Sequence, residues 1–150
     1  MSADDLIGRS RWITGPLCLF DIGLGILAAF FPTAYMELIQ PAAASDPSYL
    51  LRRTGTLWIC FAVIEGIAFF KSARFPEWIL LVAAMRLIDV PADLVYRFTD
   101  PSLDAFGKFD LIFAPAFNTI AGSVLATWYL KIRKTSRPML AKGAAHGSHS

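Results

Sequence analysis

Residues 85–97, Met-Arg-Leu-Ile-Asp-Val-Pro-Ala-Asp-Leu-Val-Tyr-Arg, place four charged side chains in a segment that otherwise has the composition of a membrane span. On a helix, Arg86, Asp89, Asp93 and Arg97 are spaced i, i+3, i+7 and i+11, which puts them in one stripe. Ionisable side chains are costly inside a membrane and normally face other helices or water. The stripe therefore predicts a helix bundle built around these charges.

The composition of the whole chain indicates a membrane protein. Of its 150 residues, 55% are hydrophobic, and the mean hydropathy is +0.50, which is too apolar for an ordinary soluble domain. Cys18 and Cys60 lie in apolar runs and form no Cys-x-x-Cys motif, so we interpret both as small buried residues. The lipid bilayer is thus the first partner that we expect.

The apolar runs predict an all-α integral membrane four-helix bundle, with spans at about residues 12–31, 49–70, 78–98 and 109–130. These spans form one domain over residues 11–131, and a short helix at the membrane interface is expected over residues 33–40. Residues 1–10 form an N-terminal segment, and residues 132–150 form a basic tail that we expect to be disordered. The first apolar run is too long for the core of a signal peptide and lacks a clear cleavage site, so we expect it to be retained. Pro91 predicts a kink or local unwinding in the third span.

Small residues predict close helix contacts in two places. One is at Gly23 and Gly25 in the first span. The other is a face of the fourth span, which is also a candidate for contact with a second copy of the chain and comprises Ala114, Asn118, Ala121 and Gly122.

The distribution of basic residues predicts that both termini are cytoplasmic. Fewer basic residues belong to the opposite side, where Arg52, Arg53, Arg97 and Lys108 are expected. The basic tail is better explained as a cytoplasmic anchor than as a nucleic-acid-binding arm, so no nucleic acid partner is expected. On the cytoplasmic side we place Arg9, Arg11, Lys71, Arg74, Lys131, Arg133, Lys134, Arg137 and Lys142.

All four spans contain polar residues within the membrane, near its centre except for Glu65, which lies on the cytoplasmic side of centre, so we expect one polar column inside the bundle. Pairing Arg86 with Asp21, Asp89 or Glu65 would offset most of the cost of burying it. Trp58 would supply a flat wall, and Asp93 lies toward the outer, wetter end. The candidate ligand-binding residues are Arg86, Asp89, Glu65, Asp21, Trp58, Asn118, Arg53 and Asp93.

Two interpretations of the column remain open. In one, the ion pairs only fix the register of the helices. In the other, the column is a charged cavity that binds a quinone or a lipid-like molecule, and the chain acts as an accessory subunit or ligand-binding module. The alternative function is a membrane enzyme or a proton-coupled carrier that uses Arg86, Asp89 and Glu65.

The absence of histidine from all four spans excludes several kinds of site. Bis-histidine haem and His-containing zinc sites have no ligands there, so we expect neither haem nor a metal. A Ser-His-Asp hydrolase would lack its base within the membrane. The cofactor is left open, with a quinone as the candidate.

The chain resembles the DoxX-like superfamily of small four-helix bacterial membrane proteins. The resemblance covers about residues 11–131 and rests on Pro32 after the first span, on Arg53-Thr54-Gly55 and on Arg86-Leu87. It implies a four-helix bundle in a bacterial inner membrane. Some members are subunits of larger complexes in quinone-linked electron transfer, so it also implies a quinone ligand and a partner complex. Glu65 and the segment 89–93 have no match in the family's pattern.

Overall fold

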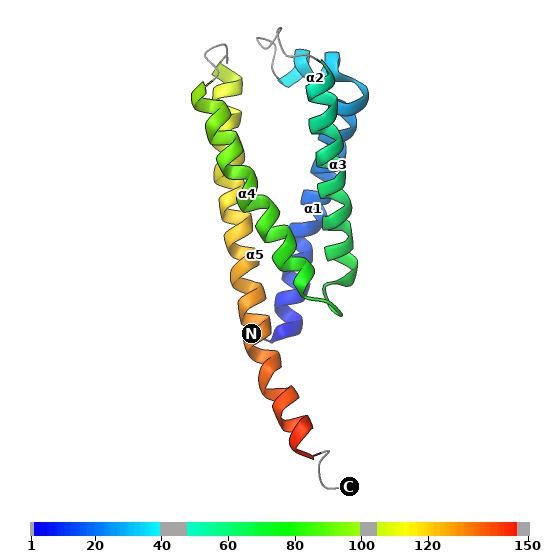
Figure 1. Cartoon of the computed structure of the whole chain (residues 1–150), viewed down its shortest axis with the longest axis vertical. Helices are drawn as coiled ribbons and strands as arrows, with labels where there is room; N and C mark the ends of the chain where they lie inside the picture. The colour runs from blue at the N-terminus through cyan, green and yellow to red at the C-terminus, as the bar shows by residue number, and fades with distance from the viewer. Residues whose placement is uncertain (1, 40–47, 100–104, 147–150) are drawn as a thin grey trace.

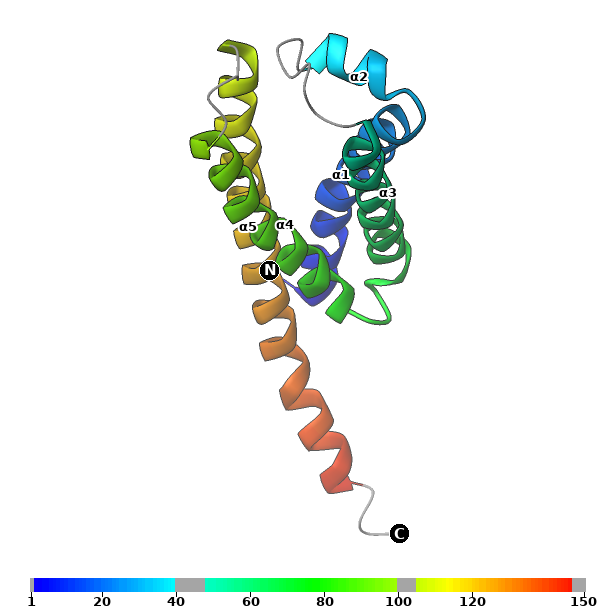
Figure 2. The same cartoon turned by 45° about the horizontal axis from the view of Figure 1, so that its top comes forward.

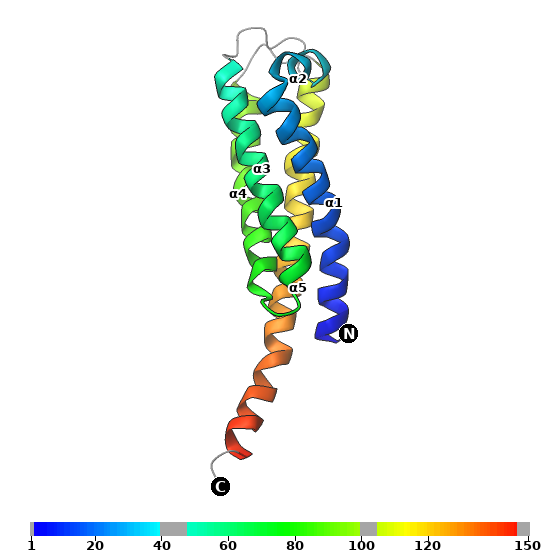
Figure 3. The same ribbon diagram turned by 90° about the vertical axis from the view of Figure 1, so that its right-hand side faces the viewer.

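The computed structural model describes residues 2–39, 48–99 and 105–146, and these ranges are almost entirely helical. The helices are α1 (Ala3–Phe30), α2 (Pro32–Ile39), α3 (Ser48–Lys71), α4 (Glu77–Thr99) and α5 (Ala105–His146). The described ranges contain no strand, which confirms the predicted all-α class. The four long helices lie lengthwise beside one another, and α2 follows α1 at one end (Figures 1 and 3).

Three of the long helices are apolar enough to cross a membrane, over Ala3–Phe30, Leu51–Lys71 and Leu111–Thr135. Helix α4 has 23 residues, which corresponds to about 34 Å and is long enough to cross as well. It is less apolar because Arg86, Asp89 and Asp93 lie in its middle. The helix is continuous through Pro91, so the expected local unwinding is absent.

Both ends of the predicted bundle are corrected by the structure. Helix α1 begins at Ala3, and residues 3–10 are part of it, because a capping box starts the helix there: the Asp5 amide donates to Ser2 Oγ and the Ser2 amide donates to the Asp5 carboxylate, both at 3.1 Å. At the other end, α5 continues to His146 instead of giving way to a disordered tail at residue 132. The Lys, Arg, Leu and Ala residues of this segment are good helix formers. Residues 147–150 lie outside the described part.

The four long helices are arranged as two pairs, α1 with α3 and α4 with α5. The pairs lie close together at the end that carries the N-terminus, the α3–α4 turn and the C-terminal part of α5, which we call the termini end (Figure 1). Toward the opposite end, which we call the α2 end, the ribbons of the two pairs diverge (Figures 1 and 2).

The buried apolar residues follow this arrangement. A cluster that includes Leu6, Ala68, Val82 and Leu125 joins all four long helices toward the termini end. A second cluster, built on Ala28, Tyr35 and Leu51, draws its members from α1, α2 and α3. Apolar packing therefore holds the two pairs together mainly toward the termini end.

Glycines allow the closest helix contacts. A Cβ atom at Gly55 would lie 2.5 Å from the Ala29 backbone nitrogen, and one at Gly25 would lie 2.8 Å from the Gly55 carbonyl oxygen, so α1 and α3 cross backbone to backbone. The prediction of a close contact is confirmed at Gly25 and wrong at Gly23, where no atom of the described residues would lie within 4 Å of a Cβ atom. On α5, Gly122 contacts Leu87 and Ala83 of α4, so this part of the small-residue face is used within the chain.

At the α2 end, polar and aromatic contacts join α1, α2 and α3. Arg52 Nη1 donates to the Ala29 carbonyl oxygen at 2.8 Å, and this places a positive charge at the C-terminus of α1, where the helix dipole favours it. Helix α2 confirms the short helix expected over residues 33–40. Its Tyr35 ring packs against Trp58 of α3, with 5.9 Å between the ring centroids.

Candidate functional site: a buried arginine between the helix pairs

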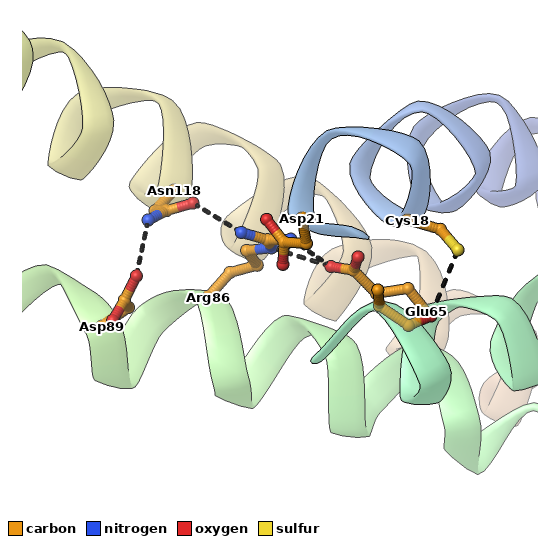
Figure 4. A network of polar contacts seen from close by, with 7 residues as sticks. Cys18, Asp21, Glu65, Arg86, Asp89 and Asn118 are labelled. Carbon is orange, nitrogen blue, oxygen red and sulfur yellow. Dashed lines mark hydrogen bonds and ion pairs between the residues drawn. The ribbon is translucent and has the colours of Figure 1, made fainter. Parts of the chain in front are cut away.

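The guanidinium group of Arg86 joins α4 to both helices of the other pair. Its Nη2 donates to Asp21 Oδ2 of α1 at 2.6 Å, and its Nε donates to Glu65 Oε1 of α3 at 2.9 Å (Figure 4). Nη2 is also in contact with Glu65 Oε1. All three residues are buried, with exposed fractions of 5% for Arg86, 3% for Asp21 and 0% for Glu65. We call these three residues the inner group.

The backbone crossing of α1 and α3 positions the two carboxylates of the inner group. Asp21 lies one turn before Gly25, and Glu65 lies on the same side of the crossing along α3. Cys18 Sγ donates to the Ala62 carbonyl oxygen at 3.2 Å, which fixes the register of the two helices beside the inner group (Figure 4). A shift of either helix by one residue would carry its carboxylate away from Arg86.

Asn118 and Asp89 extend the inner group by two longer hydrogen bonds. Arg86 Nη1 donates to Asn118 Oδ1 at 3.5 Å, and Asn118 Nδ2 donates to Asp89 Oδ2 at 3.3 Å (Figure 4). Both donor–acceptor distances exceed the usual range for hydrogen bonds, so these two bonds are weaker than those of the inner group. Asn118 is buried, whereas Asp89 is partly exposed. We call these two residues the outer group.

The structure thus brings together five of the eight candidate residues, and the remaining three have other surroundings. Trp58 packs beside Tyr35 in the apolar cluster of the α2 end, rather than beside Arg86. Arg53 is exposed on α3. Asp93 is partly buried on α4, one turn beyond Asp89. Of the three acids proposed as partners of Arg86, Asp21 and Glu65 pair with it directly, while Asp89 is reached through Asn118.

A further set of buried polar residues escaped the sequence analysis. Ser10 and Thr14 of α1 and Ser72 after α3 are each 1% exposed. On α1, Ser10 and Thr14 precede Cys18 and Asp21 at intervals of three or four residues, so all four share one face. This spacing was the available signal.

The cluster contains more acids than bases. The inner group has one guanidinium group and two carboxyl groups, and Asp89 adds a third carboxyl group. With every carboxyl ionised, the inner group alone would carry one excess negative charge. In the described part of the chain, no three His, Cys, Asp or Glu side chains are arranged to hold a metal ion. Protons are the simplest way to balance the charge of this site.

A surface hollow of about 420 Å³ lies apart from the cluster. It is lined by Thr127, Leu130, Lys131, Arg133 and Lys134 of α5. Thr127 is nine residues from Asn118, which is about 13 Å along the helix. The hollow therefore belongs to the basic termini end and not to the site around Arg86.

Comparisons of the chain with protein-family models, with curated proteins and with solved structures found no match. The resemblance to the DoxX-like superfamily therefore stays a prediction. The function has to follow from the geometry of the inner and outer groups.

Proposed function

We propose that α1, α3, α4 and α5 all cross a bacterial inner membrane, with both termini in the cytoplasm, and that the outer group binds the polar head of a small amphiphile such as a quinone or a lipid. The proposal combines a bilayer-spanning bundle with a site between its two helix pairs. In this proposal the chain works as an accessory subunit of a larger membrane complex or as a homo-oligomer.

The arrangement of the ends supports the proposed topology. The N-terminus, the α3–α4 turn and the C-terminal part of α5 share the termini end (Figure 1). Exposed basic side chains at this end include Lys71, Arg74, Lys131, Arg133 and Lys134. Such an excess is typical of the cytoplasmic side.

Substituted cysteines test the topology, and above all whether α4 crosses the membrane. Ala73 and Thr99 are exposed residues that lie on either side of the apolar part of α4. With Cys18 and Cys60 replaced by serine, we expect a membrane-impermeant maleimide to label Thr99→Cys in intact spheroplasts and to label Ala73→Cys only after lysis. Labelling of both cysteines in intact spheroplasts would contradict the crossing of α4. Labelling of Ala73→Cys in intact spheroplasts and of Thr99→Cys only after lysis would contradict the orientation.

The two long hydrogen bonds of Asn118 are the observation that carries the proposed ligand site. A ligand carbonyl or hydroxyl group can replace either bond without breaking the short bonds between Arg86 and the acids. Asn118 Nδ2 would then donate to the ligand, and the Asp89 carboxyl group would accept a hydrogen bond from it or exchange a proton with it. The inner group would remain intact and hold the two pairs in place.

The surroundings of the outer group support an amphiphile rather than a fully polar ligand. The ribbons of the two pairs diverge toward the α2 end (Figure 2). The apolar cluster at that end includes no residue of α4 or α5. Both helices expose apolar side chains there, namely Leu94, Phe98, Phe113 and Phe117. An apolar tail would cover these side chains.

Binding of decylubiquinone to the full chain in nanodiscs tests this site. We expect Asp89→Asn and Asn118→Ala each to weaken binding about tenfold, the loss expected for one hydrogen bond to a buried group. Thr99→Val is a control on the same helix, because the Thr99 hydroxyl is exposed and bonds the Val95 carbonyl oxygen. Repeating the measurement with a short-chain phosphatidylglycerol shows whether the site selects the quinone or a lipid.

Two outcomes would contradict the ligand site. The first is that neither probe binds the wild-type chain. The second is that Asp89→Asn and Asn118→Ala bind as tightly as Thr99→Val. Asp89→Asn and Asn118→Ala both keep the bonds of the inner group. Unchanged binding in these two variants would therefore mean that the inner and outer groups only fix the positions of the helices.

The excess of carboxyl groups favours a second candidate function, a proton-coupled carrier. A buried site that holds more acids than bases takes up protons readily, and such sites mark proton relays in membrane proteins.

A further inference from the structure

Three buried oxygen atoms between Arg86 and the termini end have no hydrogen-bond partner in the described part of the chain. They are Glu65 Oε2, Thr14 Oγ1 and Ser72 Oγ. Each belongs to a residue that is at most 1% exposed. A polar atom buried without a partner costs free energy, so three such atoms in one region indicate a purpose other than packing.

The register of α1 and α3 places these atoms in order along the bundle. The two helices run antiparallel, and Gly15 approaches Phe69 while Cys18 bonds the Ala62 carbonyl oxygen. In this register Glu65 is level with Cys18, so Thr14 lies one turn closer to the termini end. Ser10 and Ser72 lie about one turn beyond Thr14.

The spacing of these levels suits bridging water. One helical turn rises about 5.4 Å, which is close to the span of two hydrogen bonds joined through one water molecule. Buried waters are typically held by polar groups that otherwise lack partners. Ser10, whose hydroxyl donates to the Ile7 carbonyl oxygen at 2.8 Å, can still accept a hydrogen bond. The hydroxyls thus occupy successive levels, about one helical turn apart, between the termini end and Glu65.

Glu65 is the residue of the inner group best suited to hold a proton. Its Oε1 receives both contacts from Arg86, while Oε2 has no partner among the residues that the structure describes. The charged or titratable groups around it are Arg86 of α4 and Asp21 and Cys18 of α1. Protonation at Oε2 would remove the one excess negative charge and leave Arg86 paired with Asp21.

We propose that Glu65 binds a proton that enters from the termini end through the water-bridged hydroxyls of Ser72, Ser10 and Thr14. A hydronium ion at that end loses the proton and becomes water, the proton passes along the bridging waters and hydroxyls, and an O–H bond forms at Glu65 Oε2. Release reverses these steps. This inference deepens the proposed function and rests on its membrane placement. In this proposal the two carboxyl groups are reached from opposite ends of the bundle. Protons reach Glu65 from the termini end, whereas the ligand reaches Asp89 from the α2 end.

Infrared spectroscopy of the full chain in nanodiscs can observe Glu65 alone. The sequence contains three glutamates, Glu37, Glu65 and Glu77, so Glu37→Gln with Glu77→Gln leaves only Glu65. With carboxyl-¹³C glutamate incorporated, a protonated Glu65 gives a carboxylic acid band that the aspartates do not share. We expect this band near neutral pH, and we expect it to shift when the sample is transferred to D₂O.

The rate of that shift tests the route. We expect Thr14→Val and Ser72→Ala each to slow the exchange about tenfold, because each removes one hydrogen-bonding step. Thr14→Ser keeps the hydroxyl and should exchange at the wild-type rate. Thr127→Val is the matched control, since the Thr127 hydroxyl is exposed and bonds the Ser123 carbonyl oxygen.

Three results would overturn the inference. One is the absence of the labelled band at neutral pH. Another is a Thr14→Val, Ser72→Ala double variant whose labelled band shifts in D₂O at the wild-type rate. A third is that Asp89→Asn slows this shift while the hydroxyl variants do not. Failure here is distinguishable from failure of the ligand site, because Thr14→Val and Ser72→Ala leave the outer group intact and should bind decylubiquinone normally.

Discussion

Arg86→Met is expected to lower the free energy of unfolding by about 3–5 kcal/mol, because it leaves buried carboxyl groups without their cation. Asp21 and Glu65 are almost completely buried, and Arg86 contacts both. The substitution also removes the polar connection between the two helix pairs. Reversible unfolding in mixed micelles, followed by circular dichroism, measures the loss.

Neutralising the correct partners should restore stability. We expect Arg86→Met combined with Asp21→Asn and Glu65→Gln to recover most of the loss, because no unpaired charge then remains. Asp89→Asn should recover little, since Asp89 reaches Arg86 only through Asn118. A full rescue by Asp89→Asn, or a stable Arg86→Met single variant, would be incompatible with the ion pairs described above.

Arg86→Lys is the conservative control. Lysine keeps the charge but replaces the planar group that reaches Asp21 and Glu65 from separate nitrogen atoms. We expect an intermediate loss of stability. A loss equal to that of Arg86→Met would show that the geometry of the guanidinium group matters more than its charge.

The charged stripe of α4 was visible in the sequence because helix periodicity alone puts Arg86 and Asp89 on one face. The sequence did not show which acids pair with Arg86, because the pairing depends on how α1 and α3 cross. Gly23 and Gly25 look equivalent in the sequence, yet only Gly25 lies at the crossing. The choice between Asp21, Glu65 and Asp89 therefore required the three-dimensional register.

The start of α1 was marked in the sequence by a capping signal, but hydrophobicity decided the prediction. Ser2 and Asp5 form a capping box that could have placed the start of α1. The start was instead predicted from hydrophobicity, which rises only at Trp12. A polar first turn and an apolar continuation can belong to one helix, since a helix may extend beyond the bilayer.

The sequence places Ser10 and Thr14 on the face of Asp21, but it could not show which of these hydroxyls lacks a partner. Serine and threonine in apolar helices often bond a carbonyl oxygen of the preceding turn, as Thr56 and Thr119 do here. Thr14 has the same sequence context but makes no such bond. Only the positions of the atoms distinguish a hydroxyl that is satisfied within its own helix from one that has no hydrogen-bond partner in the described part of the chain.

The two helix pairs are joined by two different kinds of contact. Apolar packing joins them toward the termini end, and the inner group joins them near the middle. The pairs themselves are held by close backbone contacts at Gly25 and Gly55 and at Gly122. Changes at Asn118 or Asp89 can therefore alter the outer group without separating the pairs.

Gly55→Val should destabilise the chain by about 2–3 kcal/mol, because a side chain at this position overpacks the crossing of α1 and α3. Its Cβ atom would lie 2.5 Å from the Ala29 nitrogen and 2.7 Å from the Gly25 carbonyl oxygen, and neither backbone atom can move without displacing its helix. The displacement would also move Asp21 away from Arg86. Unfolding in mixed micelles again gives the magnitude.

Gly23→Ala is the matched control for Gly55→Val, and its effect should have the opposite sign. A Cβ atom at Gly23 would have no described atom of the chain within 4 Å, so the substitution adds no contact there. Alanine loses less conformational freedom than glycine in a helix, which should stabilise the chain by about 0.5–1 kcal/mol. Equal losses of stability in Gly55→Val and Gly23→Ala would mean that glycine acts through helix flexibility. Opposite signs would place the close contact at Gly55. The approach of Asp21 to Arg86 would then depend on that contact.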